Sequence, residues 1–417
     1  MKSAQLGIRC RAHPSQLHGE GPGERSRAWL HRLTVLALLL GITTAAAAQA
    51  PFDKPPKRPH LDGKADTNSA LAYYSYGIAE LEGEPYQAAT AFYWAARLDP
   101  TWAAPLYAQR TALLLSHPQT DLTFYLTRHR DALKSRDIQR IDSLAYRALV
   151  KNPFIDRRMD GMLITVWLGR ETGHEVTLNN IGIGNPNILA WAAYLRGDYQ
   201  NAAERLEKLI GHSPRSPGLR YWMALTRFAQ GQLDSARDQL RQSVDFEREV
   251  EEDIPGVGWL SHASDEYAIG LLFGLTSQPD SARAAYERAL SEDVRFHPAH
   301  YQLGKMRLLA HDTTGAIDEC LQAVSLSPDD AGYLTDVGVL LIATGQVDSG
   351  ATMLRRAVAA EPYYALPHYT LGLVYEQSGM RAEARGEFET FVALAPQNMT
   401  AGLSAAQRHL EGLKGAP

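Results

Sequence analysis

The chain has 417 residues, of which 45% are hydrophobic and 21% charged, a composition typical of a globular protein. It contains 42 Lys and Arg against 47 Asp and Glu, a formal net charge of −5. This mildly acidic balance lacks the basic surface with which proteins bind nucleic acid or anionic membranes. Two cysteines, Cys10 and Cys320, exclude a disulfide framework and a cysteine-based zinc site.

The first fifty residues have the organisation of a secretory signal peptide. Three arginines between positions 25 and 32 precede an apolar run at 33–42, and the small-x-small pattern Ala-Gln-Ala ends at Ala50. The apolar run is shorter than the roughly 20 residues of a membrane span. We therefore predict that residues 1–50 are cleaved after Ala50 and that the mature protein is periplasmic or secreted, without membrane insertion. An uncleaved anchor is the alternative.

Residues 51–66 carry four prolines and predict a stiff, extended linker. Residues 67–182 are predicted to form an N-terminal helical region. Within it, residues 86–100 repeat a pattern found more clearly further along the chain, although Gly77 stands one residue out of register. The rest, 103–182, predicts either degenerate helical hairpins or a separate small helical domain.

A period of about 34 residues dominates the second half of the chain. A glycine recurs in each copy where the two antiparallel helices of a hairpin are expected to touch, and a large apolar residue follows at a fixed offset. These positions lie on one helical face. Proline ends the second helix in several copies. The recurring glycines are Gly270, Gly304, Gly338 and Gly372, and their apolar counterparts are Tyr286, Cys320, Leu354 and Phe388.

The period divides the chain into segments. Two copies occupy residues 183–250 in a frame of their own, and four more occupy residues 263–398. The segment 251–262 is in excess of the period, separates the two frames and predicts an insertion. Residues 399–417 predict an amphipathic helix and tail that cap the open end of the stack.

These columns resemble the tetratricopeptide repeat, a family of helix–turn–helix units about 34 residues long. The resemblance implies an all-α, right-handed superhelical solenoid of antiparallel hairpins. It also implies that the first helix of each hairpin lines a concave groove, into which its fifth residue points. From that column and its neighbours we predict a peptide-binding set: Tyr221, Trp222, Phe228, Tyr267, Tyr301, Lys305 and Tyr369. The alternative is that these tyrosines pack against the neighbouring helix.

No motif for catalysis, cofactors or metals is found. The chain has no GxSxG turn, phosphate-binding loop or HExxH sequence. The histidines His297 and His300 are interpreted as helix-end residues, and Cys320 as a buried apolar residue. We therefore predict no enzyme, no cofactor and no metal.

The predicted function is a protein-interaction scaffold of the bacterial cell envelope with a protein or peptide partner and no nucleic acid. The alternatives are a substrate-holding subunit of an envelope hydrolase, glycosyltransferase or export complex, and an enzyme within 103–182.

Overall fold

The computed structural model describes residues 56–116 except 62, 64 and 100, then thirteen positions between 141 and 165, and residues 186–253, 262–395 and 399–414. The predicted signal peptide therefore lies outside the described residues, as do most of the predicted insertion and much of the region after α4. Within the described residues the regular structure is entirely helical, as predicted.

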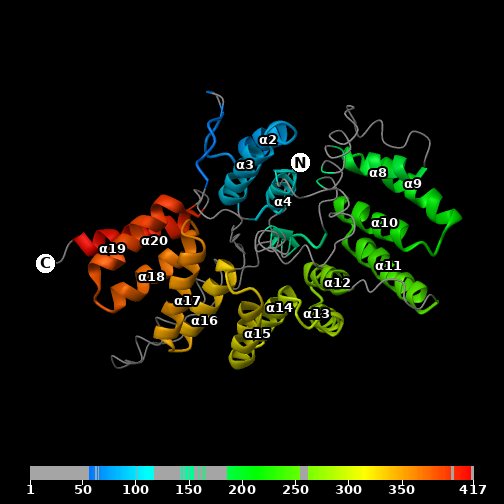
Figure 1. Ribbon diagram of the computed structural model, residues 1–417. Coiled ribbons are helices and arrows are strands. Elements are labelled where there is room, and N and C mark those ends of the chain that lie inside the picture. Colours follow the sequence, from blue (N-terminus) through cyan, green and yellow to red (C-terminus); the bar gives the residue numbers. More distant parts are fainter. Residues whose placement is uncertain are drawn as a thin grey trace, which may run out of the picture.

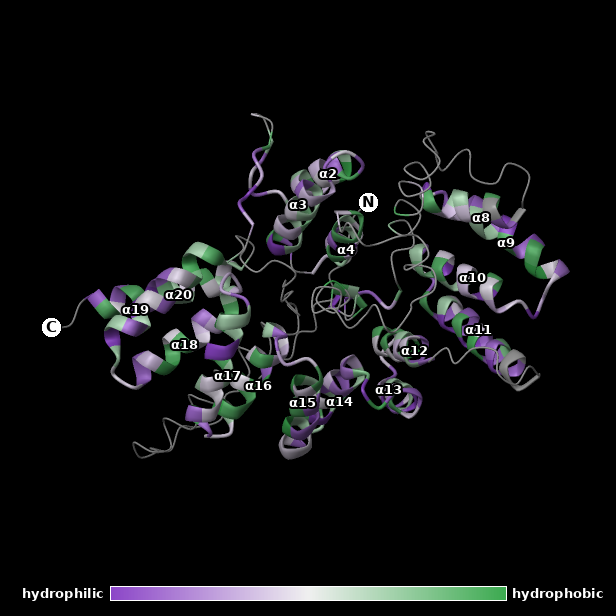
Figure 2. Cartoon of the chain, viewed as in Figure 1, coloured by the Kyte–Doolittle hydropathy of each residue, from purple (hydrophilic) through white to green (hydrophobic). Residues whose placement is uncertain are grey.

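The helices form antiparallel hairpins that follow one another round an arc (Figure 1). In chain order the arc contains α8 (Pro186–Leu195), α9 (Tyr199–His212), α10 (Pro217–Ala229), α11 (Leu233–Asp253), α12 (Ala263–Leu275), α13 (Pro279–Glu292), α14 (His297–Leu309), α15 (Thr313–Leu326), α16 (Ala331–Ala343), α17 (Val347–Ala360), α18 (Ala365–Gln377), α19 (Arg381–Leu394) and α20 (Thr400–Lys414). Each helix carries both hydrophobic and hydrophilic residues (Figure 2). None of the described helices is both long and apolar enough to cross a membrane.

The recurring glycines bring the two helices of each hairpin into contact, as predicted. A Cβ atom on Gly304 would lie 2.5 Å from the Cys320 sulfur, and one on Gly372 would lie 2.7 Å from the Phe388 ring. Any larger residue would push the helices apart. In the first hairpin, a Cβ on Gly77 would lie 2.6 Å from Phe92, so this glycine makes the same contact despite its shifted register.

The turn inside each hairpin of the arc places one residue in the left-handed region of backbone conformation. Glycine adopts this conformation without the steric penalty that a Cβ atom brings. Two hairpins use other residues there, Ser277 with φ 58° and His311 with φ 61°. The glycines at the equivalent turns are Gly197, Gly231, Gly345 and Gly379. This turn position thus recurs with the same period as the helix contacts.

Alanines of the second helices form the contact between successive hairpins. Ala289, Ala323 and Ala357 are fully buried, and Phe391 takes their place in the last hairpin. Helix α20 then packs on α19, where the Phe388 and His409 rings stack with centroids 4.9 Å apart. The array is therefore the predicted all-α solenoid with a capping helix at its C-terminal end.

Helix α11 is longer than the other second helices of the arc. It has 21 residues, whereas α9, α13, α15, α17 and α19 have 14 each. The extra length begins at Glu247, before the predicted insertion at 251–262. Arg248 on this extension contacts the buried Glu266 of α12 and also Glu292. The extension of α11 beyond the usual 14 residues is therefore helical, and Arg248 ties it to the next hairpin.

A further hairpin, α2 (Ala70–Glu80) with α3 (Pro85–Leu98), lies with α4 (Ala104–Ser116) in the opening of the arc (Figure 1). Its contact with the far side of the arc is direct. The Tyr93 hydroxyl donates to Glu361 Oε1 over 3.2 Å in a buried position, and the Arg97 guanidinium lies 5.7 Å from the Tyr363 ring. The N-terminal helices thus bridge to the loop between α17 and α18.

The described part of the predicted linker packs on this first hairpin. The Trp94 indole nitrogen donates to the carbonyl of Pro56 over 3.2 Å, and Arg58 lies above the rings of Tyr73 and Trp94. Leu61 is buried beside them. Residues 56–61 therefore have no regular structure but are held against α2 and α3.

Candidate functional site: the inner surface of the array

Three of the tyrosines predicted to bind a ligand are buried within the array. The exposed fraction of Tyr267 is 0%, that of Tyr301 4% and that of Tyr369 8%. Tyr369 packs on Phe388, Phe391 and His409, all from the last hairpin and the cap. In this structure these three rings offer little surface to a ligand, and their burial favours the alternative, packing between neighbouring helices.

The buried tyrosines link one hairpin to the next by hydrogen bonds. Gln302 Nε2 donates to the Tyr267 hydroxyl over 3.2 Å, and the Tyr301 hydroxyl donates to Asp336 Oδ2. Both pairs are separated by 35 positions, one period plus one. The fifth residue of one first helix therefore binds the sixth residue of the following one. This repeated bond fixes the stacking of adjacent hairpins.

Lys305 lies beside the Tyr301–Asp336 pair and is half-buried. Its ammonium is 5.4 Å from the Tyr301 ring centroid, an attractive cation–π geometry. Burial raises the pKa of Asp336 to about 6, although the Tyr301 hydrogen bond and the charge of Lys305 oppose that rise. The predicted residues Tyr301 and Lys305 thus form one cluster, with Asp336 as its third member.

Trp222 has an inter-hairpin role. Its ring meets Trp191 with centroids 6.2 Å apart and Tyr194 with centroids 5.5 Å apart, both at near-perpendicular angles. Those two residues belong to α8, so Trp222 fills the contact between the first two hairpins of the arc. It is only partly buried.

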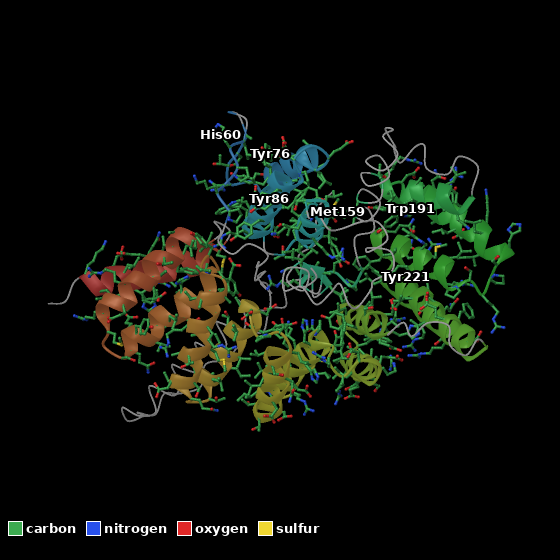
Figure 3. All side chains as sticks on the ribbon, viewed as in Figure 1. His60, Tyr76, Tyr86, Met159, Trp191 and Tyr221 are labelled. Atoms are coloured by element: carbon green, nitrogen blue, oxygen red, sulfur yellow. The ribbon has the colours of Figure 1, made fainter. Side chains whose placement is uncertain are left out.

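Tyr221 and Phe228 contact a segment of the chain that belongs to none of these hairpins. Phe154 packs its ring against Phe228 with centroids 5.1 Å apart and against Tyr221 with centroids 6.3 Å apart. Phe154 is 3% exposed and shares a hydrophobic cluster with residues of α8 to α14. Figure 3 labels Met159, from the same stretch, inside the arc and Tyr221 on the array. Tyr221 and Phe228 therefore pack against another segment of the same chain.

The same segment makes an ion pair with the array further along the arc. Arg147 Nε lies 3.3 Å from Asp330 Oδ2, and both side chains are 9% exposed. Asp330 Oδ1 meanwhile accepts the backbone N–H of Tyr333, which caps the N-terminus of α16 and fixes the carboxylate. We call the surface from α10 to α16 that contacts residues 147–154 the inner surface.

The histidines have structural partners. His300 uses both ring nitrogens, one with Glu319 at 2.8 Å and one with the Val294 carbonyl at 3.1 Å. His368 repeats the arrangement two hairpins later with Glu387 and the Pro362 carbonyl. Each histidine thus joins the two helices of its hairpin to the preceding loop. His297 bonds the Tyr333 hydroxyl over 3.0 Å.

Glu247, His262 and Asp265 bring side-chain ligand atoms within 4.8 Å of one another at the start of α12. His262 Nδ1 lies 3.4 Å from Glu247 Oε2. Three side chains are one fewer than the four protein ligands of a structural zinc site. Cys320 is buried, as predicted, and burial raises the pKa of its thiol to about 12.

Two family models match the chain, both described as tetratricopeptide repeat, over residues 193–251 and 267–331. These ranges cover hairpins of the arc and agree with the regular spacing of the glycine contacts and left-handed turns. The chain thus carries tetratricopeptide repeats over these two ranges. Proteins of this kind are in general scaffolds that bind protein or peptide partners.

A curated relative of the repeats is the BBSome complex member bbs-4 of Caenorhabditis elegans, 26% identical over 183 residues. The match covers 43% of this chain and 38% of that protein, so the chain spans about two fifths of its length.

Solved structures with similar folds include the C-terminal part of a tetratricopeptide repeat protein from Cytophaga hutchinsonii (12% identity, 55% of this chain and 95% of that one, TM-score 0.41). Another is YrrB, described as having an unusual peptide-binding site (18% identity, 49% and 99%, TM-score 0.38).

The sequence did not indicate the contact between the inner surface and its occupant, which is made by Arg147, Phe154 and Asp330. Asp330 carries a readable signal, since an aspartate before a helix predicts an N-cap. Arg147 and Phe154 lie in the stretch where the repeat pattern is lost, and nothing in their spacing indicates the distant hairpins that they contact.

Proposed function

We propose that this tetratricopeptide repeat protein is a non-enzymatic scaffold of the bacterial cell envelope that binds a segment of a partner protein on its inner surface. The observation that supports this proposal is that residues 147–154 pack on that surface. An aromatic residue is held at α10 and a cation at the N-terminus of α16. Residues 147–149 and 151 of this segment are helical. A surface that accommodates these side chains has the apolar and acidic groups to accept those of another segment.

The stacked hairpins supply the rigidity that such binding needs. Neighbouring hairpins are joined by the Tyr267–Gln302 and Tyr301–Asp336 bonds and by fully buried alanines. A surface already ordered in this way loses little conformational entropy when a partner binds.

Photo-crosslinking in the native cells tests the scaffold function. A photoreactive amino acid is placed on first helices of the inner surface at Tyr221 or Lys305, which are half-buried, and in matched variants on second helices at Asp318 or Arg355, which are exposed. We expect the first-helix positions to capture a defined partner that the second-helix positions do not. Equal capture from both faces would contradict binding on the inner surface.

Export is the second part of the proposal and rests on the signal-peptide pattern of residues 1–50. A chain with a C-terminal tag should appear in the periplasmic or extracellular fraction, and its N-terminal sequencing should begin at Pro51. Recovery of the full-length chain in the cytoplasm would contradict export and leave the scaffold function to the crosslinking test.

A further inference from the structure

The segment that occupies the inner surface is held at two separate places. Leu149 and Phe154 are buried in the hydrophobic cluster of the repeats, and Arg147 reaches the N-cap carboxylate of Asp330. The occupant therefore has three contact elements: a cation, an aliphatic residue two positions later and an aromatic residue seven positions after the cation.

Each contact element has a complementary group on the repeats. Tyr221 and Phe228 offer aromatic faces to Phe154, and aromatic pairs at these distances attract beyond simple burial. Asp330 offers a carboxylate that its capping bond already orients. A charged group fixed before binding needs no reorganisation to receive a cation, so it favours a basic residue in the segment.

The basic end of the occupant is incompletely satisfied. Arg147 Nη1 is buried and has no hydrogen-bond acceptor, while its Nε reaches Asp330 at the long distance of 3.3 Å. Burial also lowers the pKa of Lys151 to about 8, against the attraction of Asp330 and Asp99. For Arg147, a buried cation with an imperfect partner, this burial carries a desolvation penalty. A segment that pairs better with Asp330 would have an advantage over residues 147–154.

We propose that the inner surface recognises protein segments with the pattern Arg-x-Leu-x4-Phe, and that residues 147–154 occupy it as an internal competitor. The partner class is thus a segment with a basic residue followed seven positions later by an aromatic one. This inference rests on the proposed scaffold function and adds the chemistry of the partner. Binding of the partner requires release of the internal segment from α10 and α16.

A binding titration with the full chain tests the proposal. The probe is a fluorescein-labelled peptide of residues 144–157, with a scrambled peptide as control, and the readout is fluorescence anisotropy. We expect weak binding to the wild-type chain, because the surface is occupied. In the variant with Arg147→Ala and Phe154→Ala, binding should be at least about tenfold tighter, and adding Asp330→Asn should remove most of that gain. Asparagine retains the helix cap but lacks the charge.

The milder variant Arg147→Gln keeps the aromatic contact and serves if the double variant fails to fold. It should also bind the peptide more tightly than the wild type does. A folded variant of either kind that gains no affinity would overturn the proposal, as would equal binding of the scrambled peptide. Specific capture of a partner from Lys305 in the crosslinking test would, in that case, leave the scaffold function intact.

Discussion

Tyr301 donates its hydroxyl hydrogen to Asp336, which lies one hairpin further along the array. The pair is packed with Lys305, and burial raises the pKa of the carboxyl to about 6 in spite of both neighbours. The hydrogen bond of Asp336 to Tyr301 joins two repeats. Burying the charged form of this carboxyl away from water, however, opposes folding.

Replacing Asp336 by asparagine should stabilise the protein in a pH-dependent way. Because the folded pKa is about 6 and the unfolded value 3.8, the folded state holds a proton that the unfolded chain releases between those values. The stability that Asp336 contributes is therefore present below about pH 4 and lost as the pH rises through about 6. At about pH 8 the asparagine variant should gain on the order of 1–3 kcal/mol in free energy of unfolding.

Urea denaturation between about pH 4.5 and pH 8 measures this gain. The difference between variant and wild type should increase with pH. A difference that is constant over the range would contradict the assigned pKa, and Asp318→Asn, at an exposed position of α15, is the matched control.

The left-handed turn positions predict stabilising substitutions. Ser277→Gly and His311→Gly each relieve an unfavourable backbone conformation and should raise the free energy of unfolding by about 1 kcal/mol. Gly345→Ala, at the equivalent turn, should lower it by a similar amount. Should the two glycine variants prove less stable than the wild type, the backbone assignment of these turns would be wrong.

Gly372 and Gly386 form a matched pair within the last hairpin. Gly372→Ala would place a Cβ 2.7 Å from Phe388 and should destabilise the protein by about 1–3 kcal/mol. Gly386 lies in α19 with open space around it, so Gly386→Ala should stabilise the helix by about 0.5–1 kcal/mol. Thermal melts of both variants check the pair, and equal effects would contradict the close helix contact.

The Cys320 thiol should be unreactive in the folded protein. Its sulfur lies in the hydrophobic core and its pKa is raised to about 12, so little thiolate exists near pH 8. In a Cys10→Ser background, iodoacetamide should label the chain in urea but not in buffer, as read by intact mass. Rapid labelling of the native protein would show that the α14–α15 contact opens readily.

The contacts within a hairpin could be predicted from the sequence because they recur at fixed spacing. The offset that separates Gly304 from Cys320 also joins Gly372 to Phe388, so one short-range pattern determines both contacts. The tyrosine column illustrates the limit of such patterns. Its period is clear, but a regular spacing does not say whether Tyr267 and Tyr301 face a groove or the next helix. Their burial and their bonds to Gln302 and Asp336 favour the next helix.

The occupied inner surface could not be predicted. Arg147 and Asp330 are separated by 183 positions, and Tyr93 and Glu361 by 268. Contacts of this range have no periodic signature, because they depend on how far the stacked hairpins curve and on where the chain returns. Residues 147–154 contact both α10 and α16 because the curvature of the stacked hairpins places these two helices on either side of the segment.

The measurement that tests the placement of this internal segment most directly is a double-mutant cycle between Arg147 and Asp330. Urea denaturation of Arg147→Met, Asp330→Asn and the double variant gives the coupling free energy of the pair. For a buried ion pair with both side chains 9% exposed, we predict a coupling of roughly 1–3 kcal/mol. A coupling indistinguishable from zero, with both single variants folded, would contradict the occupation of the inner surface by the chain's own segment.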